Sequence, residues 1–279
     1  MVNDTAQVPV VMAFSGIDAT GGAGIQADIE SLASMGCHAA PIVTALTVQD
    51  TRNVQSYVAV DASQLIAQAR AVLEDIPVRA FKIGMLGSVA NAEAIHSILA
   101  DYPNMPVVVD PVLVAGGGGP LSSADETAAL INLILPLTTV LTPNTAEAMA
   151  LAPEADTIDA AAQRILDQGP EFVLVTGTDQ ATRQVENRLF GNRRLLETYT
   201  WDRLHASFHG SGCTLASAIA GLLAQGMEPY TALFEAQEYT WETLKHGYRL
   251  GMGQLLPNRL FWSSCGERVR ETIARNDRP

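Results

Sequence analysis

The stretch VPVVMAFSGIDATGGAGIQADIESLASM, residues 8–35, decides the fold. Its first part, Val8 to Ser15, is a continuous apolar run, which predicts a strand buried on both faces. A glycine-rich turn, Gly16 to Gly24, follows this run. Helical spacing then extends over Ala23 to Met35, and Gly36 is a suitable residue to end the helix. A strand, a turn and a helix in this order are the opening unit of an α/β fold.

The residue spacing in the helix expected over Ala23 to Met35 predicts which side chains face the sheet. Ile25, Ile29 and Leu32 recur at the spacing of one helical face, so we expect them to pack against the sheet. Asp28 falls on another part of the helix and is expected away from that face.

The same alternation continues along the chain and predicts a mostly parallel sheet with right-handed crossovers, flanked by helices. We expect further strands over 38–46, 79–84, 107–110, 139–142 and 172–175, and a hairpin of 185–190 with 195–201 turning at Gly191-Asn192. We expect further helices over 61–75, 88–100, 125–135, 144–151, 158–168, 215–225 and 230–248. With no repeat and no linker, residues 1–279 are expected to form a single domain, with its core over about 8–262.

Composition limits the partners. The formal charge is −13 and no basic stretch occurs, which disfavours nucleic-acid binding. The three cysteines, Cys37, Cys213 and Cys265, fit neither a zinc site nor a disulfide framework, and free thiols suggest a cytoplasmic location. We see no leader peptide at the N-terminus and no apolar window long enough for a membrane helix. An acidic chain that binds phosphates must neutralise them locally.

The segment HGSGCT, His209 to Thr214, stands immediately before a long apolar helix. Gly210 and Gly212 allow close approach of the backbone to a ligand, and with Ser211 they open the first helical turn, whose N–H groups favour anions. Cys213 lies in this turn, where we expect a lowered thiol pKa and a role as base or anion partner. A glycine-rich helix start with an inert, buried cysteine is the alternative.

The turn Gly16 to Gly24 lacks the G-x-G-x-x-G spacing of a dinucleotide fingerprint, and no acidic residue stands about 20 positions later. A short polar lid over a small substrate fits better, with Asp18 accepting hydrogen bonds from the ligand. A plain strand-to-helix turn remains the alternative.

Two carboxylates follow neighbouring strands. Asp110 ends VVVD, and Glu147 stands three residues after Asn144 in TPNTAE. Hard oxygen ligands of this kind suit Mg²⁺ held through waters, as metal-assisted phosphoryl transfer needs. Alternatively, Asn144 caps a helix and Glu147 completes a capping box.

Weaker signals complete the set. Gln49, expected in a loop after a strand, has an amide able to pair with a ring nitrogen and an amino group together, although a solvated loop residue is the simpler interpretation. Lys82 is either an alternating strand cation or a charge at the substrate end. His96, His205 and His246 show no ligand spacing.

Several segments resemble, in order and spacing, those of the hydroxymethylpyrimidine/phosphomethylpyrimidine kinases, over roughly residues 8–262. They are GIDATGGAGIQAD, TALTVQDT, KIGML, VVVDPVLVA, LTPNTAEA, HGSGCTLASAIA and the tail from Gly251 through Gln254 to Pro257 and Phe261. The resemblance implies a ribokinase-like three-layer α/β sandwich, commonly a homodimer, that transfers phosphate from ATP with Mg²⁺ to the pyrimidine and to its monophosphate in thiamine biosynthesis.

The resemblance also implies roles for individual residues. Cys213 would be catalytic beside the transferred phosphate, with Gly210, Ser211 and Gly212 forming the anion hole. The pyrimidine pocket would be lined by Gly16, Asp18, Ala23, Gln49, Met85 and Val112. Asn144, Thr176 and Gly177 would meet the nucleotide, and Glu147 and Asp110 would organise Mg²⁺. A cysteine at position 213, where sugar kinases of the superfamily and many pyridoxal kinases carry aspartate, favours the pyrimidine.

The chain departs from the family pattern at two places where lysines are usual. VKGG is replaced by Val175 to Thr178, and AKSG by Ala115 to Gly118. Because a phosphate-clamping cation contributes several kcal/mol to transition-state stabilisation, Mg²⁺, the anion hole and Arg188 or Arg203 are expected to compensate. A pyridoxal kinase on the same fold and a non-catalytic pyrimidine sensor are the alternatives.

Overall fold

The computed structural model describes residues 8–114, 121–178, 180 and 182–263. Within them, one nine-stranded sheet runs through the molecule in the order β3-β2-β1-β4-β5-β6-β7-β8-β9. The strands are β1 (Val10–Ile17), β2 (His38–Gln49), β3 (Val54–Ala59), β4 (Val78–Ile83), β5 (Val107–Val109), β6 (Val140–Leu141), β7 (Phe172–Val175), β8 (Gln184–Gly191) and β9 (Arg194–Asp202).

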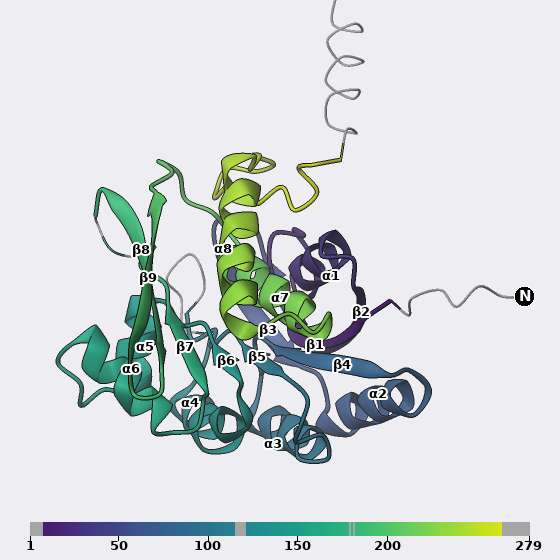
Figure 1. Ribbon diagram of the computed structural model, residues 1–279. Coiled ribbons are helices and arrows are strands. Elements are labelled where there is room, and N and C mark those ends of the chain that lie inside the picture. The colour runs from purple at the N-terminus through teal and green to yellow at the C-terminus, as the bar shows by residue number, and fades with distance from the viewer. Residues whose placement is uncertain (1–7, 115–120, 179, 181, 264–279) are drawn as a thin grey trace, which may run out of the picture.

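Helices cover both faces of this sheet, so the expected three-layer α/β sandwich is confirmed (Figure 1). One face packs against α1 (Gly24–Ser34), α7 (Ser211–Ala224) and α8 (Pro229–Lys245). The other packs against α2 (Ala62–Asp75), α3 (Val89–Leu99), α4 (Ala124–Ala129), α5 (Thr145–Leu151) and α6 (Ile158–Leu166). No helix in the described part of the chain is long and apolar enough to cross a membrane.

The strands from β2 through β1, β4, β5 and β6 to β7 are parallel, as expected, and the two edges of the sheet are antiparallel. At one edge, β3 pairs antiparallel with β2; β3 was not predicted, because its residues VQSYVA do not alternate regularly between apolar and polar. At the other edge, the hairpin of β8 and β9 turns at Asn192 and Arg193, whose φ angles are 49° and 58°, and not at Gly191-Asn192. Paired left-handed residues suit a tight hairpin because their twist matches that of the strands.

The helix predicted over 125–135 changes its winding along its length. α4 ends at Ala129, a π-helical turn spans Leu130–Ile134, and a 3₁₀ turn spans Leu135–Leu137. Pro136 lies in that last turn and cannot donate the backbone hydrogen bond that an α-helix would require there.

The face of α1 differs from the prediction. Ile29 is 40% exposed, whereas Asp28 and Ser31 are fully buried beside Ile25 and Leu32. Apolar spacing alone placed Ile29 inward, but Asp28 faces β4 and α7, where Lys82 and Ser217 bind its carboxylate. The prediction for Ile29 and Asp28 was therefore wrong.

The fold gathers the ends of the parallel strands at one edge of the sheet. α7 is buried along its whole length from Cys213 to Ala224, so its N-terminus is fixed above that edge. The segments that follow β1, β4, β5, β6 and β7 converge there with the start of α7. This is the place where open α/β sheets bind ligands.

A buried arginine from the C-terminal segment ties this region together. Arg259 is 2% exposed, and its guanidinium donates to the carbonyls of Gly21 and Gly22, to Thr214 Oγ1 at 2.9 Å and to Glu30 Oε2 at 3.0 Å. One side chain thus joins the turn after β1, the helix α1 and the first turn of α7. No pattern in the sequence predicts this role, because a single arginine near the C-terminus is expected to be a solvated charge.

Candidate active site

A cavity of about 630 Å³ opens at the carboxyl ends of the strands. With one exception, the residues predicted for the site line it: Gly16, Asp18, Ala23, Gln49, Met85, Asp110, Val112, Asn144, Glu147, Thr176, Gly210, Ser211, Gly212 and Cys213. Gly177 is the exception; its N–H donates to Asn187 Oδ1 at 3.1 Å behind the wall. Residues far apart in the sequence are thereby brought to one site.

The anion turn, which we define as residues 209–214, is the start of α7 itself. Gly210 is the N-cap residue, with a left-handed φ of 87°, and the helix begins at Ser211 and not at Leu215 as predicted. A Cβ on Gly210 would overlap the carbonyl of Gly22, so this close approach of two backbones requires glycine. The first N–H groups of α7 face the cavity with the helix dipole behind them, which is the arrangement that binds phosphate oxygens.

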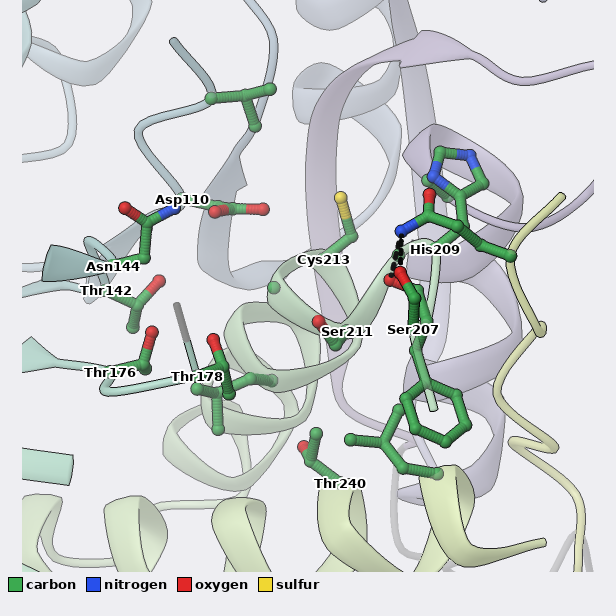
Figure 2. A pocket seen from close by; sticks show the side chains of 18 of the residues that line it. Asp110, Thr142, Asn144, Thr176, Thr178, Ser207, His209, Ser211, Cys213 and Thr240 are labelled. Atoms are coloured by element: carbon green, nitrogen blue, oxygen red, sulfur yellow. Dashed lines mark hydrogen bonds between the residues drawn. The ribbon is translucent and has the colours of Figure 1, made fainter. Parts of the chain in front are cut away.

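Cys213 lies in the first turn of α7, 9% exposed and beside Asp110 (Figure 2). Burial raises the pKa of its thiol to about 12, although the nearby ammonium of Lys82 opposes the shift. The predicted lowering of this pKa by the helix N-terminus was therefore wrong, because desolvation outweighs the dipole. The thiol is protonated at neutral pH and hydrogen-bonds to the Asp110 carboxylate.

Asp18 is buried, and its carboxylate is already used inside the chain. Oδ1 accepts from the N–H of Thr20 at 2.8 Å, and Oδ2 accepts from Thr20 Oγ1, from the N–H of Ala23 and from His209 Nε2 at 2.8 Å. Burial would raise the pKa of Asp18, but the hydrogen bonds from His209 and Thr20 outweigh it, and the pKa lies below its ordinary value. Asp18 thus shapes the turn and fastens it to the anion turn through His209, a link that sequence reasoning missed.

Asn144 and Glu147 form the capping box of α5. Asn144 Oδ1 accepts from the N–H of Glu147 at 2.8 Å, and Glu147 Oε2 accepts from the N–H of Asn144 at 2.9 Å. Both side chains nevertheless line the cavity, and Figure 2 shows Asn144 and Thr142 near Asp110 on the cavity wall. The capping role that the sequence left open is therefore confirmed, and it does not remove the two residues from the site.

These residues fit a magnesium ion of the kind that binds with phosphates. No cluster of three His, Cys, Asp or Glu side chains arranged to hold a metal occurs among the described residues. Mg²⁺ in phosphoryl-transfer sites needs fewer protein ligands, because it takes one or two carboxylates and otherwise waters and phosphates. Burial raises the pKa of Asp110, which marks a carboxylate that a cation in the cavity would stabilise. Asp110 and Glu147 are accordingly the groups suited to hold it.

A small apolar cluster forms one end of the cavity. Ala45, Met85 and Leu121 are buried together, with Val54 and Val112 packed against them. Gln49 reaches the cavity from the end of β2, where it pairs with Val54 of β3, so it lies in a strand and not in the predicted loop. A flat ring with polar edges matches this combination of apolar walls and one amide.

The opposite end of the cavity is bounded by β9, α8 and the segment after β7. Trp201 stacks on Trp241 with ring centroids 6.4 Å apart, and both line the cavity. Arg203 donates to the carbonyls of Thr178 at 3.1 Å and Gln180 at 2.6 Å, and also to those of Gly177 and Thr182. Its hydrogen-bonding capacity is therefore directed at this segment.

Arg188 does not supply a cation to the site in this structure. Its guanidinium is paired with Asp159 at 2.6 Å and lies over the ring of Phe190, and it is not among the described residues that line the cavity. Of the two arginines expected to replace the missing lysines, Arg203 alone reaches the cavity wall. The other departure from the family pattern, Ala115 to Gly118, lies outside the described residues.

Comparison with known proteins agrees with this geometry. A family model described as phosphomethylpyrimidine kinase matches residues 18–258. A hydroxymethylpyrimidine/phosphomethylpyrimidine kinase from Synechococcus elongatus is 38% identical over 255 residues, covering 88% of this chain and 95% of the relative.

Solved structures agree as well. A phosphomethylpyrimidine kinase from Clostridium difficile superposes with a TM-score of 0.73 at 32% identity, covering 85% of this chain and 100% of that one. A Bacillus subtilis pyridoxal kinase, solved as an ADP complex, superposes with a TM-score of 0.82 at 27% identity, covering 90% of this chain and 97% of that one. The cavity at the strand ends, the anion turn and these matches lead to one conclusion: the chain is a kinase that belongs to the phosphomethylpyrimidine kinase family.

Proposed function

We propose that the protein uses ATP and Mg²⁺ to phosphorylate 4-amino-5-hydroxymethyl-2-methylpyrimidine, and then its monophosphate to the diphosphate, for thiamine biosynthesis. The proposal rests on one observation. A single cavity is lined by the anion turn, by Asp110 and by an apolar pocket that carries the amide of Gln49. Relatives with this pair of activities in their name align over 88% of the chain.

The cavity suggests how the two substrates are arranged. The pyrimidine ring lies against Met85 and Val112, with Gln49 pairing to its amino edge, and the hydroxymethyl group points toward the anion turn. The nucleotide enters from the side of Trp201 and Trp241, near Asn144 and Thr176, and its terminal phosphate meets the first N–H groups of α7. This arrangement places the acceptor oxygen in line with the phosphate, which is most of what phosphoryl transfer requires from a protein.

In this proposal Cys213 redirects its single S–H from the Asp110 carboxylate, with which it hydrogen-bonds in this structure, to charge that develops on the transferred phosphate. A thiol whose pKa is raised to about 12 keeps its proton at neutral pH, so it can donate a hydrogen bond, whereas the thiolate is scarcely populated. Asp110 and Glu147 would hold Mg²⁺, which would supply positive charge to the phosphate oxygens. Gly210, Ser211 and Gly212 contribute backbone N–H groups that need no rearrangement during the reaction.

Pyridoxal is the competing substrate, because structures of Staphylococcus aureus pyridoxal kinase superpose with a TM-score of 0.83 at 25% identity. We expect kcat/KM for hydroxymethylpyrimidine to exceed that for pyridoxal by at least about tenfold, since a pocket built for one ring edge rejects another that leaves its polar groups unpaired. Steady-state assays with both compounds measure this ratio, with Gln49→Leu as a variant that should lower it. A higher kcat/KM for pyridoxal would assign the protein to the other activity.

We further propose that the chain is one kinase domain that forms a homodimer in the cytoplasm. The exposed face of the β2–β3 edge carries Leu46, Val48 and Val58, which are 52%, 58% and 70% exposed, so this edge offers an apolar surface to a second copy. Light scattering tests the dimer, and a mass equal to one chain would contradict it.

A further inference from the structure

A buried ion pair lies behind the active site and takes no part in the mechanism above. Lys82 of β4 and Asp28 of α1 are both fully buried, with Nζ 2.8 Å from Asp28 Oδ1. Ser217 of α7 donates to the same oxygen at 2.7 Å. Neither Lys82 nor Asp28 is among the described residues that line the cavity. Burying both charges costs desolvation free energy, so the position of this ion pair needs an explanation.

The sheet directs Lys82 toward the catalytic residues. Lys82 pairs with Val108 on β5, and side chains alternate along a strand, so Lys82 and Asp110 project from the same face toward α7. On α7, Ser217 lies one turn after Cys213, so the partner of Asp28 and the thiol share one side of the helix. The carboxylate of Asp110 reaches that helix as well, since a Cβ on Gly212 would stand 3.2 Å from Asp110 Oδ1.

The ammonium leans toward the cavity end of its strand. A Cβ on Gly84 would stand 2.7 Å from Lys82 Nζ and 2.6 Å from Ser15 Oγ, so glycine at this position makes room for the ammonium. Ser15 lines the cavity, which places Nζ directly behind the cavity wall. Apart from the ion pair, Nζ has no hydrogen-bond partner among the described residues. Among these residues, Asp28 alone therefore pairs directly with the charge of Lys82.

Three acidic groups surround this one cation: Asp28, Asp110 and Cys213. Burial alone would lower the pKa of Lys82, but its interactions with these groups, above all with the charge of Asp28, outweigh it and the pKa lies above its ordinary value. Lys82 is thus positively charged throughout the working range of pH. With Asp28 as its direct partner, the remaining attraction acts on the Asp110 carboxylate, with which the neutral Cys213 thiol hydrogen-bonds.

We infer that Lys82 is a positioning residue for phosphoryl transfer, whose buried charge holds the Asp110 carboxylate and the Cys213 thiol together against the first turn of α7. Without the cation, the carboxylate would lose the attraction that directs it toward α7 and would turn into the cavity. Both groups would then lose the orientation that the transition state needs, while the pyrimidine pocket around Met85 would be unchanged. The inference rests on the proposed function, because it concerns the orientation of groups used in the transfer step.

Two nearly isosteric variants separate this role from a structural one. Lys82→Met and Asp28→Asn each break the ion pair, but only the first removes the cation. We expect Lys82→Met to lower kcat by about 10- to 100-fold with the KM values for pyrimidine and ATP within about threefold of wild type, as for the loss of a group that acts on the transition state. Asp28→Asn should keep a kcat at least about tenfold above that of Lys82→Met. A kcat that falls equally in the two variants, or one that is unchanged in Lys82→Met, would overturn the inference.

If Lys82→Met folds poorly, the double variant Lys82→Met/Asp28→Leu distinguishes a positioning role of Lys82 from a structural role of the ion pair. Replacing a buried pair by apolar residues restores stability in many proteins, so its melting temperature should recover while its kcat stays low. A kcat that recovers with the melting temperature would show that the pair is structural. All assays use whichever of hydroxymethylpyrimidine and pyridoxal the wild type turns over better. A wild type inactive on the pyrimidine would therefore refute the proposed substrate without obscuring the effect of Lys82.

Discussion

Replacing Cys213 by alanine should lower kcat by about 10²- to 10³-fold, the effect of removing one donor from a preorganised anion site. The KM for the pyrimidine should change little, because the thiol acts at the phosphate and the ring is held elsewhere. Steady-state kinetics with ATP in excess measure both quantities. The effect is large because the buried thiol and the Asp110 carboxylate lie together at the start of α7.

Cys213→Ser is the informative control for the role of the thiol. A serine hydroxyl still donates a hydrogen bond but is an even weaker acid than the thiol. If Cys213 acts as a donor, as its pKa of about 12 indicates, the serine variant should keep a substantially higher kcat than the alanine variant. Equal losses in Cys213→Ser and Cys213→Ala would favour a thiolate base and contradict the donor role.

Gly210→Ala should destabilise the protein and remove most of its activity. The φ of 87° at this position costs a residue with a Cβ about 1–2 kcal/mol. The new methyl group would also meet the Gly22 carbonyl and the Arg259 guanidinium, which hold the two turns together. The anion turn must then move, so we expect a lower free energy of unfolding and a fall in kcat/KM of about 10²-fold or more. Urea unfolding and initial rates measure the two effects.

Gly226→Ala provides the matched control. Gly226 ends the same helix with a φ of 84°, but a Cβ there meets nothing within 4 Å. It should therefore show only the conformational penalty of about 1–2 kcal/mol, with kcat/KM near that of wild type. A Gly210→Ala variant no less stable and no less active than Gly226→Ala would contradict the close packing of the two turns.

The sequence predicted the layers of the fold and the position of the cavity well, for a physical reason. Buried parallel strands such as β1 (Val10–Ile17) and β7 (Phe172–Val175) are almost wholly apolar, and the loops after them must meet at one sheet edge. β3 was not predicted because its short sequence, VQSYVA, lacks the regular alternation of apolar and polar residues that indicates a half-buried strand. The π-helical turn at Leu130–Ile134 depends on local winding that residue spacing does not encode.

The polar interior could not be predicted in the same way. Asp28 looked like a surface residue and Ile29 like a core residue, because spacing assumes that only apolar groups are buried. The partners that make Asp28 a buried residue come from β4 and α7, far away in the sequence. The same holds for His209 and Arg259, which bind the turn after β1 from 191 or more positions away in the sequence. The pKa of Cys213 likewise follows from burial that a motif does not reveal.

The most direct test of the proposed function is to incubate the purified protein with ATP, Mg²⁺ and hydroxymethylpyrimidine and to resolve the products by mass spectrometry over time. The account predicts the monophosphate first and the diphosphate later, with both absent when Mg²⁺ is chelated and strongly reduced in Cys213→Ala. Monophosphate without diphosphate would contradict the second step, for which Arg203 is the cation at the cavity wall. No phosphorylated pyrimidine at all, from a folded protein that binds ATP, would contradict the proposed function.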